Sequence, residues 1–259
     1  MFEFLGRLPA LTGSLVAMVI TAGVGLGVYV GLSRIISRSQ SEDLKEGAGN
    51  LFRVVGILVA LLLSLAFGQV IADWRAIEDA VDREAVAIGD LLSGLRLYDV
   101  EATREIRTNL IDYTHTIVED DWPAMAENEL SFRGYALKKR ISAAVLALTP
   151  TNERQELVKP RLLDDVDSLS DYRLIRLNHA QGQTPFYLPV VVFGFLVSIV
   201  CFGSYRPNAA LLLLVTLYAA FFGLALYLVV SLSDPFSGGN AIESTTFERL
   251  LDWTQDVEN

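Results

Sequence analysis

The chain has 259 residues, of which 52% are hydrophobic and 20% charged, and its mean hydropathy is +0.39. This hydropathy exceeds that of an ordinary soluble domain of this size, so the composition predicts a membrane protein. The 31 acidic residues outnumber the 21 basic ones, which argues against a nucleic-acid partner because phosphate binding needs a basic surface.

Four charge-free stretches are each long enough to cross a hydrocarbon layer about 30 Å thick, which takes about 20 apolar residues in a helix. The first stretch is similar to a signal peptide, but it runs for 26 residues without an A-x-A cleavage site, so we expect a retained helix. The four predicted spans cover residues 8–33, 54–72, 186–204 and 207–233.

These spans predict an all-α integral membrane protein with four transmembrane helices and a helical-bundle insert between the second and the third. A first hairpin takes residues 8–72 and is closed by a loop at 34–53. A soluble insert takes 73–185, a second hairpin takes 186–233, and a C-terminal tail takes 234–259. Two membrane hairpins are therefore expected on either side of one soluble insert.

The density of basic residues predicts which side of the membrane holds the insert. With four spans, the insert and both termini share one side, and the two short loops share the other. Positive charge marks cytoplasmic loops, so the insert is expected outside the cytoplasm. The basic residues of the short loops are Arg34, Arg38, Lys45, Arg53 and Arg206.

The insert is predicted to be a bundle of antiparallel helices, because apolar residues recur along it at steps of three and four. Neither Gly nor Pro separates Gln69 from Ile88, so the second span is expected to continue into the insert as one long helix. A last helix at about 157–178 is expected to be interrupted by Pro160. The seams of the first three helices are Trp74, Ile77, Val81, Ile88, Leu91, Leu95 and Tyr98; Ile106, Leu110, Tyr113 and Ile117; and Leu137, Ile141, Val145 and Leu148.

Glu84 interrupts the first of these apolar seams. An unpaired carboxylate there would cost several kcal/mol or stay protonated. Arg173 and Arg176 lie one turn apart near the membrane end of the insert, so we predict that one of them pairs with Glu84. The pair either fixes the register of the bundle, which we favour, or acts as a gate or ion-binding element.

Enzymatic chemistry finds no support in the sequence. It contains no GxSxG, Walker loop or HExxH motif, and no catalytic residue, cofactor or metal ligand is predicted. The single cysteine, Cys201, excludes an intramolecular disulfide, and His115 and His179 are expected to be ordinary helix-surface residues. The acidic run 119–121 is expected to be a solvated helix end rather than a weak cation site.

No Asp, Glu, Lys, Arg or His lies inside any predicted span, which counts against proton-coupled transport. A channel with an apolar constriction fits this absence, and so does a protein without a pore. The turn after the fourth span is either an ion-binding turn at a pore mouth or, as we favour, a helix stop. It consists of Asp234, Pro235, Phe236, Ser237 and Gly238.

Several short motifs follow one another along the chain at defined places relative to the four spans. They are Glu46-Gly47-Ala48-Gly49, Trp74, Ala80-Val81-Asp82-Arg83-Glu84-Ala85, Tyr113 with Trp122, Arg173-Leu174-Ile175-Arg176-Leu177, and Asp234-Pro235-Phe236-Ser237-Gly238. In their order and spacing these motifs resemble the bestrophin-like domain family of mostly bacterial membrane proteins, and the resemblance covers nearly the whole chain. The family is named for a remote similarity to bestrophins, which are pentameric anion channels with four spans and a helical insert.

This resemblance implies a homo-oligomer, a pentamer by analogy, that conducts inorganic anions through the lipid bilayer of the bacterial inner membrane. It also implies that the second span lines the pore and that the insert is cytoplasmic, which is opposite to the density of basic residues. The competing hypothesis is a non-conducting membrane scaffold or sensor whose insert binds a protein partner. The pore-lining candidates are Leu61, Ser64, Leu65, Phe67 and Gln69.

Overall fold

The computed structural model describes residues 9–36, 42–180 and 185–258, and within these ranges every regular element is a helix. Residues 1–8, 37–41, 181–184 and 259 lie outside the described residues. They include Leu8 of the first predicted span, Arg38 of the first predicted loop, part of the end of the insert and the last residue of the tail. The helices are α2 (Ala10–Ile36), α3 (Glu42–Tyr98), α4 (Arg104–Thr116), the π-helix η1 (Ile117–Asp121), α5 (Trp122–Ala126), α6 (Arg133–Ala147), α7 (Glu153–His179), α8 (Leu188–Phe202), α9 (Ala209–Leu232) and α10 (Thr245–Glu258).

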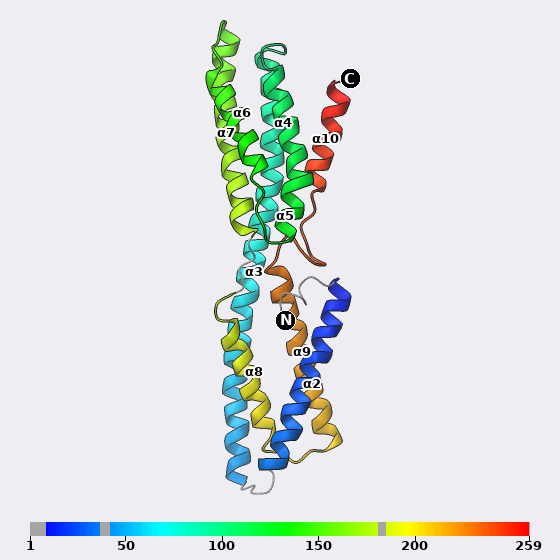
Figure 1. The fold of residues 1–259 in the computed structure, drawn as a ribbon. Helices are drawn as coiled ribbons and strands as arrows, with labels where there is room; N and C mark the ends of the chain where they lie inside the picture. The colour runs from blue at the N-terminus through cyan, green and yellow to red at the C-terminus, as the bar shows by residue number, and fades with distance from the viewer. Residues whose placement is uncertain (1–8, 37–41, 181–184, 259) are drawn as a thin grey trace. The chain divides into compact units, whose positions relative to one another are not determined.

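The chain forms two compact units. Their segments can be found in Figure 1 by helix label and by the colour of their residue numbers. The membrane unit consists of Met1–Ala72, Gln183–Asp234 and Gly238–Asn240, and it contains α2, α8, α9 and the first part of α3. The bundle unit consists of Asp73–Gly182, Pro235–Ser237 and Ala241–Asn259. It contains the rest of α3 and the helices α4, η1, α5, α6, α7 and α10.

Three of the described helices are long and apolar enough to cross a membrane: α2, α3 and α9. The third predicted span appears as α8, which is apolar but has only 15 residues. Pro189 lies in the first turn of α8, and the helix gives way to Gly203 at its other end. The four-span count therefore stays a prediction.

Small residues bring the helices of the membrane unit close together. A side chain at Gly223 of α9 would collide with Thr21 and would lie 2.7 Å from the carbonyl oxygen of Ala17, both on α2. The rings of Phe195 on α8 and Phe222 on α9 stack with centroids 4.1 Å apart. Such contacts hold helices together in lipid, where burial of apolar surface gives little driving force.

The prediction of one long helix is confirmed by α3, which has 57 residues and no proline. It also begins earlier than expected, at Glu42, so much of the loop predicted at 34–53 is helical. Glu42 and Asp43 occupy the first turn, where the helix dipole favours negatively charged side chains. The Nζ of Lys45 lies 2.7 Å from Oε1 of Glu42. The first residues of α3 are polar, so their sequence is typical of a loop between two membrane spans.

The predicted apolar seams form the core of the bundle unit. Their residues on α3, α4 and η1 are buried apart from Trp74, which is partly buried, and on α6 Ile141 and Val145 are buried. The expectation that Pro160 interrupts the last helix is wrong, because α7 runs through it. Pro160 and Glu156 are exposed, so water can reach the Glu156 carbonyl that the proline leaves without its usual donor.

The π-helix η1 lies between α4 and α5 in one helical stretch. Pro123, in the first turn of α5, has no N–H to donate to the carbonyl of Glu119, and its ring crowds that carbonyl. A wider turn relieves this conflict, and such turns recur at functional sites. Asp121, the last residue of η1, is buried.

Candidate functional site

The three residues predicted to form an ion pair lie together in the interior of the bundle unit. Glu84 comes from α3, and Arg173 and Arg176 come from successive turns of α7. The Nε of Arg176 donates to Oε2 of Glu84 at 2.6 Å, and its Nη2 donates to Oε1 at 3.0 Å. This bidentate contact is the strong form of an arginine–carboxylate pair, and both side chains are fully buried.

Asp121 and Tyr113 complete the group, which we call the ion cluster: Glu84, Tyr113, Asp121, Arg173 and Arg176. The Nη1 of Arg173 donates to Oδ2 of Asp121 at 2.8 Å, and Nη2 of Arg176 reaches the same oxygen at 3.3 Å. The hydroxyl of Tyr113 donates to Oε1 of Glu84 at 2.7 Å and accepts from Nη1 of Arg173 at 3.1 Å. Two carboxylates thus face two guanidiniums, with a phenol between them.

Asp121 is a member of this site that its sequence context did not predict. The run that contains Asp121 was expected to be solvated, and that is wrong for Asp121, which is buried and bonded to both arginines. Its neighbour Asp120 remains nearer the surface and pairs with Arg133 at 3.0 Å. The signal that was available is Pro123, a helix breaker two residues after the acidic run in a helical stretch.

Aromatic and sulfur groups enclose the cluster. The guanidinium carbon of Arg176 lies 5.8 Å from the ring centre of Trp122 and 6.0 Å from that of Phe247. Its Nη1 lies 3.5 Å from the sulfur of Met125. Both rings are within the range of a cation–π contact, so the cation is stabilised on the sides that no carboxylate covers.

The charges of the cluster hold its protonation states in place. Burial alone lowers the pKa of Arg176, but the charge and hydrogen bonds of Glu84, with Asp121, raise it above its ordinary value. Burial also lowers the pKa of Arg173, and Tyr113 and Asp121 together outweigh that effect and raise it. The pKa of the Tyr113 hydroxyl is raised by burial and by the charge of Glu84. Both arginines stay charged and the phenol stays neutral at physiological pH.

The cluster is tightly packed but not fully satisfied. Among the described residues, Oδ1 of Asp121 and Nη2 of Arg173 have no hydrogen-bond partner. A Cβ atom at Gly134 of α6 would lie 2.9 Å from both terminal nitrogens of Arg173. A side chain at this position would therefore push the guanidinium away from its contact with Asp121.

The five pore-lining candidates do not share one face of α3. Leu61 and Leu65 are exposed, one turn apart on one side of the helix, with Ser64 beside them. Phe67 and Gln69 are two residues apart, so they point to different sides. Gln69 accepts a hydrogen bond from the hydroxyl of Tyr187 at 3.2 Å, which directs it toward the start of α8.

The five-residue turn after α9 packs through one of its members. Within the bundle unit, the ring of Phe236 meets that of Trp122 edge-on, with centroids 5.3 Å apart. The carbonyl of Pro235 accepts from the backbone N–H of Ile242 at 2.8 Å. Gly238 has φ of 83°, which favours glycine, and Asp234 and Ser237 also have interaction partners.

No metal-binding geometry accompanies these residues. Within the described ranges, no group of three or more histidine, cysteine or acidic side chains is arranged to hold a metal ion.

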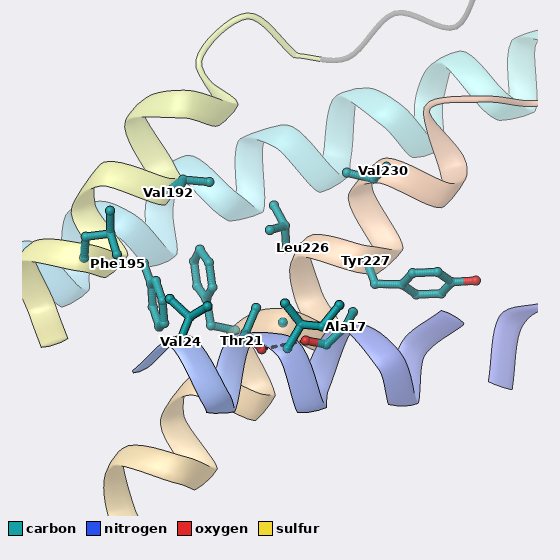
Figure 2. Close-up of a pocket in the computed structure, with 12 residues that line it drawn as sticks. Ala17, Thr21, Val24, Val192, Phe195, Leu226, Tyr227 and Val230 are labelled. Atoms are coloured by element: carbon teal, nitrogen blue, oxygen red, sulfur yellow. Dashed lines mark hydrogen bonds between the residues drawn. The ribbon is translucent and has the colours of Figure 1, made fainter. Parts of the chain in front are cut away.

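The membrane unit contains an apolar cavity of about 230 Å³ between α2, α8 and α9. Figure 2 shows the side chains that converge on it, Val24, Phe195 and Leu226 among them. The hydroxyl of Thr21, which also lines the cavity, already donates to the carbonyl of Ala17 at 2.7 Å. The lining therefore offers little to orient a polar ligand or to coordinate an ion.

Comparisons with known proteins agree with this architecture. A crystal structure of a membrane protein matches with a TM-score of 0.69 and 15% identity, covering 92% of this chain and 98% of that one. A bacterial bestrophin homologue from Klebsiella pneumoniae, carrying a point substitution, matches with a TM-score of 0.68 and 16% identity over the same shares of the two chains. A second variant of that homologue matches with a TM-score of 0.67 and 13% identity, covering 90% of this chain and 98% of that one.

At these identities the solved structures establish the fold alone. No curated protein matches the sequence. The model of the Bestrophin-like domain matches residues 19–247, which include the ion cluster, the pore-lining candidates and the turn after α9. The chain therefore belongs to the Bestrophin-like domain family.

Proposed function

We propose that the chain is one subunit of a homo-oligomeric ion channel in the bacterial inner membrane, with four spans and with α3 lining the pore. The observation that carries this proposal is the outward face of α3 in the membrane unit. Ile57, Leu61 and Leu65 on this face are 64%, 55% and 56% exposed. On the opposite face Val59 and Ala66 are buried against the rest of the unit.

The continuity of α3 favours this helix over the others as the pore lining. The helices α2 and α9 also expose apolar side chains, and lipid can cover them. Only α3, among the described helices, belongs to both units, so a change in the bundle unit can act on a pore built from it. A ring of leucines contributed by several copies would form an apolar constriction that gates by dewetting.

The test replaces leucines of the outward face with polar residues. We expect Leu61→Ser and Leu65→Asn to raise resting ion flux in liposomes, because water leaves a ring of hydroxyl or amide groups less readily. Phe67→Ser should have a weaker effect, because Phe67 points to a flank of the helix. The matched control is Leu213→Ser on α9, which should alter folding more than flux.

The same liposomes can identify the conducted ion. The resemblance to bestrophins favours inorganic anions, and the reversal potential in a chloride gradient checks this directly. If every substitution on α3 leaves the flux at that of empty vesicles while the protein remains folded and oligomeric, the scaffold or sensor function replaces the channel.

We assign the ion cluster a structural role in this channel. It is enclosed, two carboxylates face two guanidiniums in it, and the raised pKa values of Arg173 and Arg176 keep both arginines charged at physiological pH, so it suits the register of the bundle better than a gate. A gate would need access to ions or to a titrating group. Glu84→Gln should then lower stability, and any change of flux should follow the loss of folded protein.

The side of the membrane that holds the bundle unit is tested with single cysteines in a Cys201→Ala background. The density of basic residues predicts this unit outside the cytoplasm, and the bestrophin resemblance implies that it lies inside. Labelling of Ser131→Cys by an impermeant thiol reagent in intact cells supports the first topology. Protection there, together with labelling of Ser41→Cys, supports the second.

A further inference from the structure

The apolar cavity of the membrane unit is open on one side. Val24 on α2 and Leu196 on α8 are exposed and form the edges of the opening, and the α9 residues Leu226 and Val230 are buried in the opposite wall. Figure 2 shows Val24 and Leu226 pointing into the same space from their helices. Both α2 and α9 are long and apolar enough to cross a membrane. The opening therefore faces hydrocarbon when these helices span the bilayer.

Hydrocarbon suits this cavity better than water does. A buried water takes about two to four polar partners. The hydroxyl of Thr21 already donates to the carbonyl of Ala17 at 2.7 Å, and Figure 2 shows the hydroxyl end of Tyr227 directed away from the other lining residues. An empty apolar cavity, in turn, forfeits the dispersion contacts of its walls. An apolar occupant is therefore favoured over both water and a void.

The shape of the cavity indicates a chain rather than a compact ring. Its lining residues on α9 run from Phe222 to Val230, which at 1.5 Å per residue is a length of roughly 12 Å. A volume of about 230 Å³ over this length leaves a cross-section of roughly 19 Å². A dry cavity of about 150 Å³ takes one benzene molecule, so this one has room for roughly nine carbon atoms. A space this long and narrow fits part of one hydrocarbon chain.

An occupant of the cavity also supports α8. Phe195 of α8 lines the cavity and stacks on Phe222 of α9, with ring centroids 4.1 Å apart. The preceding residue, Gly194, lies against Val59 of α3. A chain in the cavity therefore packs against one side of α8, while α3 packs against another.

We propose that the apolar cavity binds one acyl chain of a phospholipid from the surrounding bilayer. The chain enters between α2 and α8 and lies along α9. This inference needs the helices to lie in a membrane but does not need the protein to conduct ions, so it goes beyond the proposed function.

The first experiment asks whether a phospholipid stays in the cavity when the bilayer is removed. The full chain is reconstituted in vesicles of phosphatidylethanolamine and phosphatidylglycerol that contain a phospholipid with a diazirine on its acyl chain. The protein is then transferred into detergent without added lipid, illuminated and mapped by peptide mass spectrometry. Labelling around Leu226 should persist, because that residue lines the cavity. Labelling around Leu213, which is exposed on the same helix outside the cavity, should be lost with the free lipid.

The second experiment fills the cavity with a side chain. Val192→Phe places a ring in the space of the acyl chain and should abolish the retained label. Val190→Phe is the matched control, because Val190 is exposed on the same helix outside the cavity, and it should keep the label. Val24→Phe closes the opening from α2 and gives a second filling variant if Val192→Phe does not fold.

Three outcomes overturn the proposal. The label around Leu226 is lost together with that around Leu213, or it persists in a folded filling variant. A free fatty acid with the same diazirine is retained while the phospholipid is not. A short bifunctional maleimide joins Val24→Cys of two copies, with Cys201→Ala, and no lipid is retained, so that a second copy covers the opening.

Ion flux in the same vesicles separates this site from the proposed function. Retained lipid without flux supports the acyl-chain site and overturns the channel. Flux without retained lipid overturns only the acyl-chain site.

Discussion

The two units bury their polar groups in opposite ways. In the membrane unit the predicted spans contain no Asp, Glu, Lys, Arg or His, and hydroxyls such as that of Thr21 bond to the carbonyl one turn earlier. In the bundle unit four ionic side chains lie in the middle of an apolar core. The buried ion pairs of Glu84 and Asp121 thus join distant segments in the bundle unit, whereas Thr21 of the membrane unit bonds within its own helix.

The difference follows from what drives helices together in each solvent. In water, burial of apolar surface holds the bundle, and directional ion pairs can then select one register. In lipid that driving force is absent, and van der Waals contact between closely packed helices takes its place. Neighbouring helices approach closely at Gly25, Gly194 and Gly223. Each unit is therefore expected to fail under a different kind of substitution, which the following four predictions test.

The largest effect is expected at the ion cluster. Glu84→Gln leaves Arg176 desolvated without its main counter-charge, and removal of one partner of a buried pair costs about 3 to 5 kcal/mol. The thermal midpoint of the purified protein should fall accordingly. The double variant Glu84→Gln with Arg176→Met should be more stable than Glu84→Gln alone, and an unchanged midpoint in the single variant would mean that the pair contributes nothing.

The next effect is expected in the membrane unit. Gly223→Leu forces a side chain into Thr21 and the backbone of α2, and overpacking of this kind costs about 1 to 3 kcal/mol. Gly27→Leu is the matched control, because nothing lies within 4 Å of a Cβ atom at Gly27. Unfolding in a detergent series should separate the two variants. Equal stabilities would remove the argument that close approach holds these helices.

The third effect is expected at Gly134 in the bundle unit, where a glycine makes room for an arginine of the ion cluster. Gly134→Ala places a methyl group against the guanidinium of Arg173, which must then give up its contact with Asp121 or shift the helix. We expect a loss of about 1 to 3 kcal/mol, as for other disturbed buried polar groups. Chemical denaturation gives the value. Restoration of stability by adding Arg173→Lys, a narrower side chain, would locate the cause in this contact.

The smallest effect is expected at Asp165 on α7, and it depends on pH. Burial and the nearby charge of Asp90 raise the pKa of Asp165, and its Oδ2 has no hydrogen-bond partner within the described chain. A raised pKa means that the folded state loses stability as pH rises through that pKa, so Asp165→Asn should stabilise the protein at pH 7. The gain should vanish below about pH 4, where the carboxyl is protonated in both states. A gain that is independent of pH would point to another cause.

The seam positions and the interrupting Glu84 could be predicted because helical period and burial are both readable from spacing. Arg173 and Arg176 followed from their position one turn apart. Asp121 could not be found this way, because a π-turn shifts the period just where that residue turns inward. Tyr113 looked like an apolar seam residue, since the sequence does not tell whether a buried hydroxyl has a partner.

The membrane unit was harder to predict in detail. The outward face of α3 contains Leu61 and Leu65, but apolar residues lie all around this helix, so their period alone does not tell which face packs inward. Contact with Gly194 settles the orientation, since Val59 lies against it. That contact joins segments far apart in the sequence.

The length of α3 limits how the membrane unit can lie in a bilayer. The part of α3 that belongs to this unit, residues 42–72, has 31 residues and no proline. At 1.5 Å per residue it is roughly 46 Å long, whereas the hydrocarbon layer of a membrane is about 30 Å thick. This part of α3 therefore has to tilt or to extend past the hydrocarbon layer at one end. Its charged first turn, with Glu42, Asp43 and Lys45, suits an end that lies among the lipid headgroups.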